Sequence, residues 1–289
     1  MTEKYALFLG CTIPTKDFSY EAALRKVCVE LKIVLADMEG YICCGYPSET
    51  PLAHDTWLAM SAYNIALAEE MGLDMVVPCN GCFGALKRAN TILKKDVDER
   101  EHINSVLKDA GKEFKGEIEI EHLIEVLYSQ KDEIATRIKR PIKIAAAAHL
   151  GCHIIRPSEI MQLDNPHILD EMIEITGASS VDYITKDKCC GNVLRGLDEN
   201  ISLEMSKQKL ADIRGEGADC MITICPACHI QYDLGQMEIK TKYKETYGVP
   251  VLHYPQLLGL ALGISANDLG ISFLKVKADE MLDNLGIAI

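Results

Sequence analysis

Short apolar runs recur along the chain and suit buried strands. Continuous apolar runs of about four to eight residues, bounded by polar segments, are typical of strands buried on both faces. The predicted strands are Lys4–Leu9, Ile33–Ala36, Met75–Pro78, Lys143–Ala148, Val181–Ile184 and Met221–Ile224. Between them, apolar residues recur every third or fourth position, which predicts amphipathic helices. The predicted helices are Ser19–Leu31, Thr56–Met71, Phe83–Leu107 and Ile201–Gly215.

Alternating short strands and helices favour βαβ units with a parallel sheet. We therefore expect an α/β fold with a small, mostly parallel sheet flanked by helices in each half of the chain. The charged connection Gln130–Pro141 separates the halves and gives domains 1–140 and 141–289. The amphipathic segment Ser272–Leu285 predicts a helix that packs on its own domain rather than on a partner.

The cysteines reveal a duplication. The chain has 12 cysteines, and ten of them form two copies of one pattern: Cys11, Cys43, Cys44, Cys79 and Cys82, then Cys152, Cys189, Cys190, Cys225 and Cys228. The interval from the cysteine pair to the CxxC motif is 35 residues in both copies, measured from Cys44 and from Cys190. Flanking residues repeat too, since Phe8-Leu-Gly-Cys11 matches His149-Leu-Gly-Cys152. The repeat predicts two domains related by a pseudo-twofold axis.

Each cysteine group follows a predicted strand, so all three groups of a copy fall at the carboxyl edge of its sheet, where ligand sites collect. Gly45 and Gly191 directly follow the cysteine pairs and permit the sharp turn that would point both sulfurs inward. Cys28 and Cys220 have no counterpart in the repeat, and we expect them to be small buried hydrophobic side chains.

Net charge and the lengths of the apolar runs limit the partners and the location that we expect for the protein. The formal net charge is −13 over 289 residues, and neither half is basic, which argues against a nucleic-acid partner. The start lacks the apolar core of a signal peptide, and no apolar run approaches the roughly 20 residues of a membrane span. We therefore expect a cytoplasmic protein. Because disulfides are rare in that reducing compartment, patterned cysteines there point to metal binding or redox chemistry.

Five cysteines per copy exceed the needs of ordinary metal sites. Zinc takes four ligands, and a cubane [4Fe–4S] cluster also takes four thiolates. One cysteine of each copy could be a bystander, one could be a ligand that substrate displaces, or the cluster could be unusual. Structural zinc with spare thiols remains an alternative.

The two five-cysteine patterns resemble the cysteine-rich CCG domain pair, and the opening Tyr5-Ala-Leu-Phe-Leu-Gly-Cys-Thr-Ile-Pro14 is similar to the start of the B subunit of heterodisulfide reductase. The resemblance covers the whole chain. It implies two noncubane [4Fe–4S] clusters, the first held by Cys11, Cys43, Cys44, Cys79 and Cys82, the second by Cys152, Cys189, Cys190, Cys225 and Cys228.

The resemblance also implies a function. The family reduces the mixed disulfide of coenzyme M and coenzyme B in methanogenesis. Electrons would arrive through the ferredoxin-like C subunit of heterodisulfide reductase from its flavin-containing A subunit, with or without a larger hydrogenase or formate dehydrogenase complex. Cleaving a disulfide takes two electrons, so two clusters facing one disulfide could each deliver one.

Substrate and proton-transfer residues are predicted from their places beside the cysteines. The substrate carries sulfonate and phosphate groups, which basic side chains would bind; arginine suits such oxyanions because its fork can bind two oxygens. The candidates are Arg195, Arg156, Lys16 and Lys188. Three histidines flank cysteines and could donate protons to a leaving thiolate or hydrogen bonds to cluster sulfur. They are His149, His153 and His229.

Two other functions stay open at this point. The chain could be an electron-transfer iron–sulfur subunit of a glycolate- or lactate-oxidising type of complex, with no substrate site of its own. It could also be a structural zinc scaffold. Iron and sulfide analysis separates zinc from the iron–sulfur alternatives.

Overall fold

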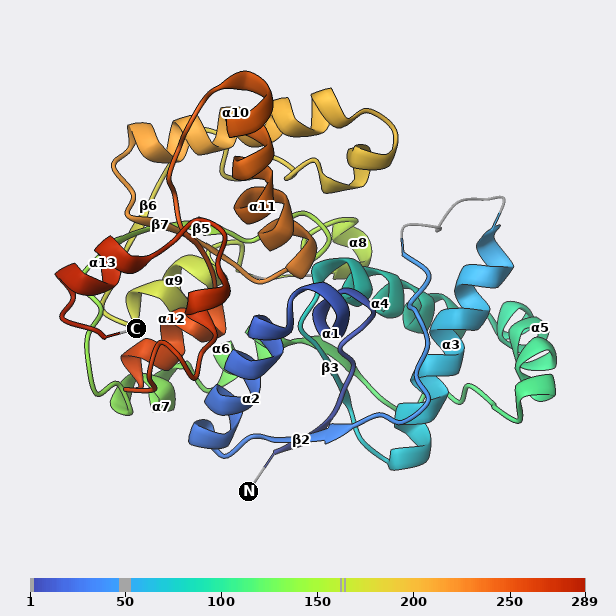
Figure 1. The fold of residues 1–289 in the computed structure, drawn as a ribbon. Helices are drawn as coiled ribbons and strands as arrows, with labels where there is room; N and C mark the ends of the chain where they lie inside the picture. The colour runs from blue at the N-terminus through green and yellow to red at the C-terminus, as the bar shows by residue number, and fades with distance from the viewer. Residues whose placement is uncertain (1–2, 47–52, 162, 164, 289) are drawn as a thin grey trace.

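Two four-stranded parallel sheets form the framework of the chain, one in each half (Figure 1). The structure is a computed structural model that describes residues 3–46, 53–161, 163 and 165–288. The first sheet has the order β2-β1-β3-β4 and the second has the order β6-β5-β7-β8. The strands are β1 Lys4–Leu7, β2 Val34–Asp37, β3 Met75–Val77, β4 Ile120–His122, β5 Ala145–His149, β6 Ser179–Val181, β7 Cys220–Thr223 and β8 Val251–His253. Equal strand order in the two halves confirms the duplicated α/β architecture.

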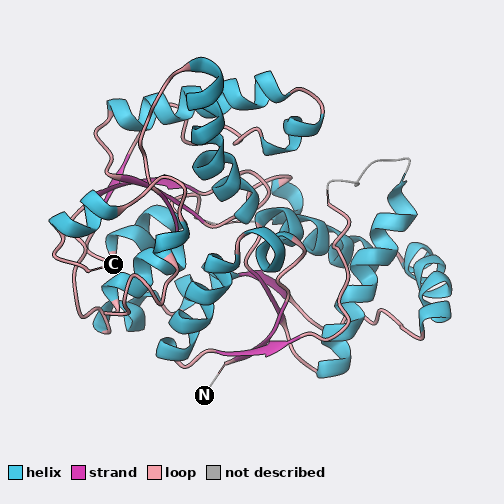
Figure 2. Cartoon of the chain, viewed as in Figure 1, coloured by secondary structure: helices cyan, strands magenta, loops and turns pink. Residues whose placement is uncertain are grey.

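Helices surround both sheets (Figure 2). The first half carries α1 Thr12–Lys16, α2 Phe18–Leu31, α3 His54–Met71, α4 Asn80–Lys95, α5 Val97–Leu107, α6 Leu123–Ser129 and α7 Lys131–Thr136. The second carries α8 Ser158–Met161, α9 Ile168–Glu174, α10 Glu199–Gly215, α11 Pro226–Tyr243, α12 Tyr254–Ala261 and α13 Asp279–Asn284. Short 3-10 turns add η2 Lys108–Ala110, η3 Asn192–Gly196 and η4 Ile271–Phe273. The domain boundary at residues 140 and 141 falls between α7 and β5 and stays a prediction.

Several predicted elements need correction. The predicted helix Phe83–Leu107 is two helices, because Asp96 is extended (φ −102°, ψ 108°) and its carboxylate accepts the N–H of Glu99 to cap α5. The predicted strand Val181–Ile184 lies earlier, at β6, and Ile184 is exposed.

The segment Ser272–Leu285 is not one helix. The carboxylate of Asp233 accepts the backbone N–H groups of Lys275 and Val276, each at 2.8 Å, before the short helix α13 begins. Leu274 and Leu282 are buried, and the ring of Phe273 lies 4.8 Å from that of Phe18 in the first half, so the segment contacts both halves.

Several elements were not predicted from the sequence, among them β4, β8 and α11. The strands β4 and β8 have only three residues each, which is too short for a periodicity to emerge. The helix α11 buries polar side chains, among them Gln231, Asp233 and Gln236, so it lacks a regular apolar face.

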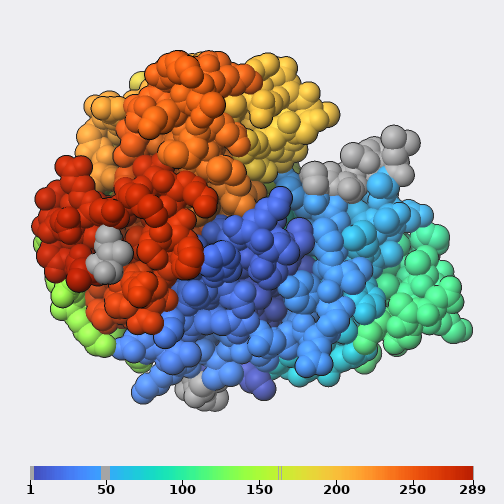
Figure 3. All heavy atoms as spheres, in the orientation of Figure 1, coloured from blue at the N-terminus to red at the C-terminus, as the bar shows by residue number. Residues whose placement is uncertain are grey.

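The two halves pack tightly on each other, as the contact between the blue and the orange-to-red surfaces in Figure 3 illustrates. Helix α12 of the second half contacts α2 of the first. At this interface the carboxylate of Asp17 faces two histidines: its Oδ2 lies 2.8 Å from His253 Nε2 and 3.2 Å from His229 Nδ1. Tyr20 stacks on His253 at 3.7 Å and donates to the carbonyl of Ile224 across the halves.

In this cluster Asp17 and His229 favour each other's charged forms. Burial would raise the pKa of Asp17, but His253 and His229 together hold that pKa well below its ordinary value. Burial would likewise lower the pKa of His229, but Asp17 more than offsets it and the pKa is raised. Asp17 is 4% exposed, so solvent screens these interactions little. Because the folded-state pKa of Asp17 is depressed, its contribution is present above the ordinary carboxyl pKa and is lost as the pH falls below it.

We predict that Asp17→Asn destabilises the fold by about 3 kcal/mol, because removing one partner of a buried charged pair leaves the other uncompensated. Chemical denaturation at neutral pH measures this. Asp268→Asn is the matched control, since Asp268 and Lys26 form an ion pair between the halves whose side chains are both 55% exposed. That control should change stability by less than about 1 kcal/mol. Equal effects of the two substitutions would contradict the claim that the buried cluster holds the halves together.

Candidate metal centre

Nine of the ten repeat cysteines line a single cavity of about 290 Å³ that receives residues from both halves. The lining cysteines are Cys11, Cys44, Cys79, Cys82, Cys152, Cys189, Cys190, Cys225 and Cys228. The tenth, Cys43, contacts this group because its thiol is hydrogen-bonded to Cys44. Cys28 and Cys220 are buried elsewhere, as expected for bystanders. The sheet edges therefore bring the two predicted sets together, and the two sets share one opening.

The CxxC motifs sit at helix N-termini. Cys79 precedes α4 and Cys225 precedes α11, both in extended conformation, so Cys82 and Cys228 follow within the first turn. Cys11 likewise precedes α1. Free backbone N–H groups and the helix dipole at such ends favour thiolates over thiols.

The cysteine pairs turn as the sequence predicted. Gly45 has φ +86° and Gly191 has φ +84°, a conformation that glycine adopts without strain. In the second half, the N–H of Gly191 points to Cys189 Sγ at 3.4 Å and the N–H of Asn192 points to Cys190 Sγ at 3.5 Å. The turn therefore directs both sulfurs and supplies them with hydrogen-bond donors.

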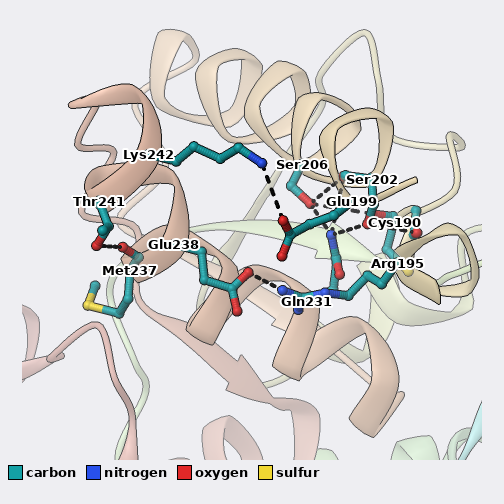
Figure 4. Close-up of polar contacts among 11 residues, drawn as sticks. Cys190, Arg195, Glu199, Ser202, Ser206, Gln231, Met237, Glu238, Thr241 and Lys242 are labelled. Atoms are coloured by element: carbon teal, nitrogen blue, oxygen red, sulfur yellow. Dashed lines mark hydrogen bonds and ion pairs between the residues drawn. The ribbon is translucent and has the colours of Figure 1, made fainter. Parts of the chain in front are cut away.

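Serines on the following helices hold the pairs in place. Ser61 of α3 donates to the carbonyl of Cys44 at 3.0 Å, and Ser206 of α10 donates to the carbonyl of Cys190 at 3.4 Å. Figure 4 shows Gln231 of α11 reaching Ser202 and Ser206. The equivalence of Ser61 and Ser206 extends the repeat beyond the cysteines.

The sulfurs are crowded. Cys44 Sγ lies 3.3 Å from Cys82 Sγ, and Cys152 Sγ lies 3.9 Å from Cys189 Sγ. Hydrogen bonds from neighbouring thiols, first from Cys43 and then from Cys82, lower the pKa of Cys44 to about 4. The same effect, led by Cys152, lowers the pKa of Cys189 to about 2. The cysteine pair of each half thus already favours a thiolate.

The two sets approach each other at Cys79 and Cys225, and each of these thiols shifts the pKa of the other across the interface. Hydrogen bonds from Cys228 and then from Cys79 hold the pKa of Cys225 well below its ordinary value, and the contact with Cys225 raises that of Cys79. Further thiolates would repel one another at these distances unless a cation lay among them. An all-sulfur donor set of this kind fits an iron–sulfur cluster, and five sulfurs in each half exceed the four ligands of zinc or of an ordinary cubane cluster.

The three candidate histidines lie in different surroundings. His153 lines the cavity, and its Nε2 is 2.9 Å from the hydroxyl of Tyr46 in the other half. His149 is fully buried, with a ring nitrogen within 4.8 Å of the sulfurs of Cys190 and Cys228. His229 turns away from the cavity toward Asp17. Of the three, only His153 is placed to meet a molecule in the cavity.

The four candidate basic residues lie outside the cavity lining. Arg195 on η3 forms an ion pair with Glu238 of α11 (Figure 4). Arg156 and Lys188 are exposed, and Lys16 lines a separate hollow beside Phe18 and Phe273. Their roles in substrate binding stay predictions.

The sequence analysis missed residues that join the halves at the cavity. Tyr46 follows the first Cys-Cys-Gly motif, and Asn80 lies inside the first CxxC motif and donates to the carbonyl of Leu150 at 2.7 Å. The positions of Tyr46 and Asn80, beside and within the cysteine motifs, could have identified them as residues of the site. Asp17, His253 and Lys209 stand outside every motif.

Comparison with known proteins agrees with this geometry. The profile of the CCG cysteine-rich domain family matches residues 5–87 and 146–233, one match per half. The chain is 41% identical over 287 residues to the B subunit of the ferredoxin/F420H2-dependent CoB-CoM heterodisulfide reductase of Methanosarcina acetivorans, covering 96% of both chains. It is 42% identical to the B subunit of the ferredoxin:CoB-CoM heterodisulfide reductase of Methanosarcina mazei, again over 96% of both chains. The chain belongs to the family of heterodisulfide reductase B subunits.

Other relatives show how widely this two-domain form is used. The chain is 30% identical to the 8-methylmenaquinol:fumarate reductase membrane anchor subunit of Wolinella succinogenes, covering 97% of this chain and all of that one. A solved structure of a hypothetical protein from Helicobacter pylori shares the fold, with a TM-score of 0.79 at 18% identity. It covers 96% of this chain, which spans 52% of that structure. In the described part of the chain studied here, no helix combines the length and the apolar composition that a membrane span needs.

We predict that Gly10→Ala impairs the first metal site, because the added Cβ would lie 2.8 Å from Cys82 Sγ. Anaerobically purified protein should lose up to about half of its iron, the share of one four-iron cluster. Gly40→Ala is the matched control: Gly40 has a similar φ of +75°, but nothing lies within 4 Å of its added Cβ. It should keep its iron and lose about 1 kcal/mol of stability from backbone strain alone. Full iron in Gly10→Ala would contradict the assignment of Cys82.

Proposed function

We propose that this chain is the catalytic subunit of a CoB–CoM heterodisulfide reductase, in which two noncubane [4Fe–4S] clusters act on the CoM-S-S-CoB disulfide. The first cluster would be held by Cys11, Cys43, Cys44, Cys79 and Cys82, and the second by Cys152, Cys189, Cys190, Cys225 and Cys228. Family membership supports the reductase assignment, and relatives at 41% and 42% identity carry this activity in their names.

The shared cavity is the observation that carries the proposal. Cysteines of both halves line one space, and Cys79 and Cys225 meet there. A disulfide in this cavity would have one metal site on each side. Bound clusters would supply the two electrons that turn one disulfide into two thiols, with two protons taken up from groups nearby.

The chain's own residues would orient the substrate and move protons. His153 and Tyr46 form a hydrogen-bonded pair at the cavity wall, drawn from opposite halves. Either could pass a proton to a sulfur released in the cavity, since an imidazole and a hydroxyl both donate and accept. Of the candidate proton donors, His153 is therefore favoured over His149 and His229.

The anionic ends of the substrate need basic partners beyond the cavity lining. Arg195, Arg156, Lys16 and Lys188 remain the candidates. Arg195 would first have to exchange its partner Glu238, because their ion pair occupies the guanidinium in this structure.

Electron supply requires other proteins. The relatives are named as B subunits, and the two CCG domains of this chain carry no recognisable flavin-binding or ferredoxin motif in their sequence. We propose that the ferredoxin-like C subunit and the flavin-containing A subunit of the reductase deliver electrons in the cytoplasm, with or without a larger hydrogenase or formate dehydrogenase complex.

The direct test is anaerobic purification followed by iron and sulfide analysis and a disulfide-reduction assay with a reduced viologen dye. We expect about eight irons per chain and reduction of the CoM-S-S-CoB disulfide. Zinc in place of iron would contradict the cofactor assignment. Iron without disulfide reduction would favour the second candidate, an electron-transfer iron–sulfur subunit of a glycolate- or lactate-oxidising type of complex.

We predict that His153→Asn lowers kcat for disulfide reduction by about 100-fold, the smaller end of the usual contribution of a proton donor. His167→Asn is the control, because His167 is exposed and pairs with Asp170 outside the cavity. It should leave kcat unchanged. Unaltered kcat in His153→Asn would assign the proton transfer to another group.

A further inference from the structure

A lysine is buried behind the second metal site, where the first half has none. Lys209 of α10 is 1% exposed. Its Nζ donates to the carbonyls of Thr185 and Lys186, the latter at 2.8 Å, and lies 3.3 Å from His149 Nδ1. Within the described chain it has no carboxylate at ion-pair distance. A buried cation with no paired anion acts over a longer range than a surface lysine.

His149 lies between the Lys209 ammonium group and the sulfurs of the second site. An ammonium group can only donate, so His149 Nδ1 accepts from Lys209 and the neutral ring carries its proton on Nε2. That Nε2 is buried and has no protein partner among the described residues. The His149 ring lies beside Cys190 and Cys228, with ligand atoms within 4.8 Å of one another. The His149 ring therefore contacts Lys209 and also lies close to the sulfurs of the second site.

The first half has neutral residues at both positions. Phe8 stands where His149 stands, because each is followed by Leu-Gly-Cys. Asn64 stands where Lys209 stands, three residues after the equivalent serines Ser61 and Ser206. Asn64 serves its local backbone by accepting from the N–H of Ile42 and donating to the carbonyl of Met60. Position 64 thus supports the cysteine loop without adding a charge.

We propose that the Lys209–His149 pair gives the metal group of the second half a higher reduction potential than that of the first, so that it accepts an electron first. A nearby positive charge and hydrogen bonds to sulfur both stabilise the reduced, more negative state of an iron–sulfur group. This inference rests on the proposed function, because it requires an iron–sulfur group at each site. Each one-electron reduction draws its electron from an external donor, and dithionite serves as that donor in a titration.

The contacts of Lys209 favour its charged form, because Nζ donates to two backbone carbonyls and faces a ring nitrogen. Burial lowers the pKa of Lys209 to about 8, while Cys228 and Cys190 act in the opposite direction. The ring of Tyr183 lies 5.4 Å from Nζ and adds a favourable contact for the cation. The surroundings of Nζ therefore support a positive charge at this position.

The test is a dithionite titration of the intact iron-loaded protein, followed by EPR, which reads each cluster's midpoint potential without turnover. We expect two midpoints in the wild type. Lys209→Met should lower the higher one by at least about 59 mV, which is a tenfold change in a one-electron equilibrium, and leave the lower one in place. Lys207→Met is the matched control, since it removes the same charge from the same helix where Lys207 pairs with Glu204 and Glu245. It should move neither midpoint.

A second variant keeps the test valid if Lys209→Met fails to fold. The double change His149→Phe with Lys209→Asn installs the residues of the first half, which this fold already accommodates at the equivalent positions. It should bring the two midpoints together. An unmoved higher midpoint in both variants would overturn the inference, as would loss of the second cluster from both, because the pair would then only support the site. Intact midpoint shifts with no disulfide reduction by the wild type would contradict the proposed function and leave this inference standing.

Discussion

The contact between Cys79 and Cys225 is the constraint on which the rest of the structure depends. Two thiols from opposite halves meet only if both CxxC turns, and the sheets that carry them, are held at a fixed separation. The buried Asp17–His229–His253 cluster, the stacked Tyr20 and the bond from Asn80 to Leu150 all cross the same interface. These contacts therefore join the two halves around a shared cavity.

Duplication explains the placement of the sulfurs, and divergence explains what surrounds them. Both halves present their cysteines at helix N-termini and at glycine turns with nearly equal φ. Beyond the sulfurs the halves differ. Phe8 and Asn64 make the back of the first site neutral, whereas His149 and Lys209 make the back of the second site polar and positively charged. Two similar sites with different surroundings can receive electrons in a defined order.

The sequence predicted best those features in which the cysteines and the internal repeat occur together. The spacing of the cysteines predicted two equivalent sites, the turns at Gly45 and Gly191 and the shared sheet edge, because each depends on local geometry that the repeat preserves. Long-range partners could not be predicted. Nothing in the sequence links Asp17 to His253, or Lys209 to His149, because these pairs form only when distant elements pack. Helix boundaries failed where a polar residue overrode the periodicity, as Asp96 does by capping α5.

The central claim is that two iron–sulfur clusters face one disulfide in a common cavity. Mössbauer spectroscopy of protein enriched in ⁵⁷Fe, recorded with and without the CoM-S-S-CoB disulfide under reducing conditions, tests it most directly. The shared cavity predicts that one bound disulfide changes the signals of both clusters. A change confined to one cluster, with the other unaffected at saturating disulfide, would contradict the claim.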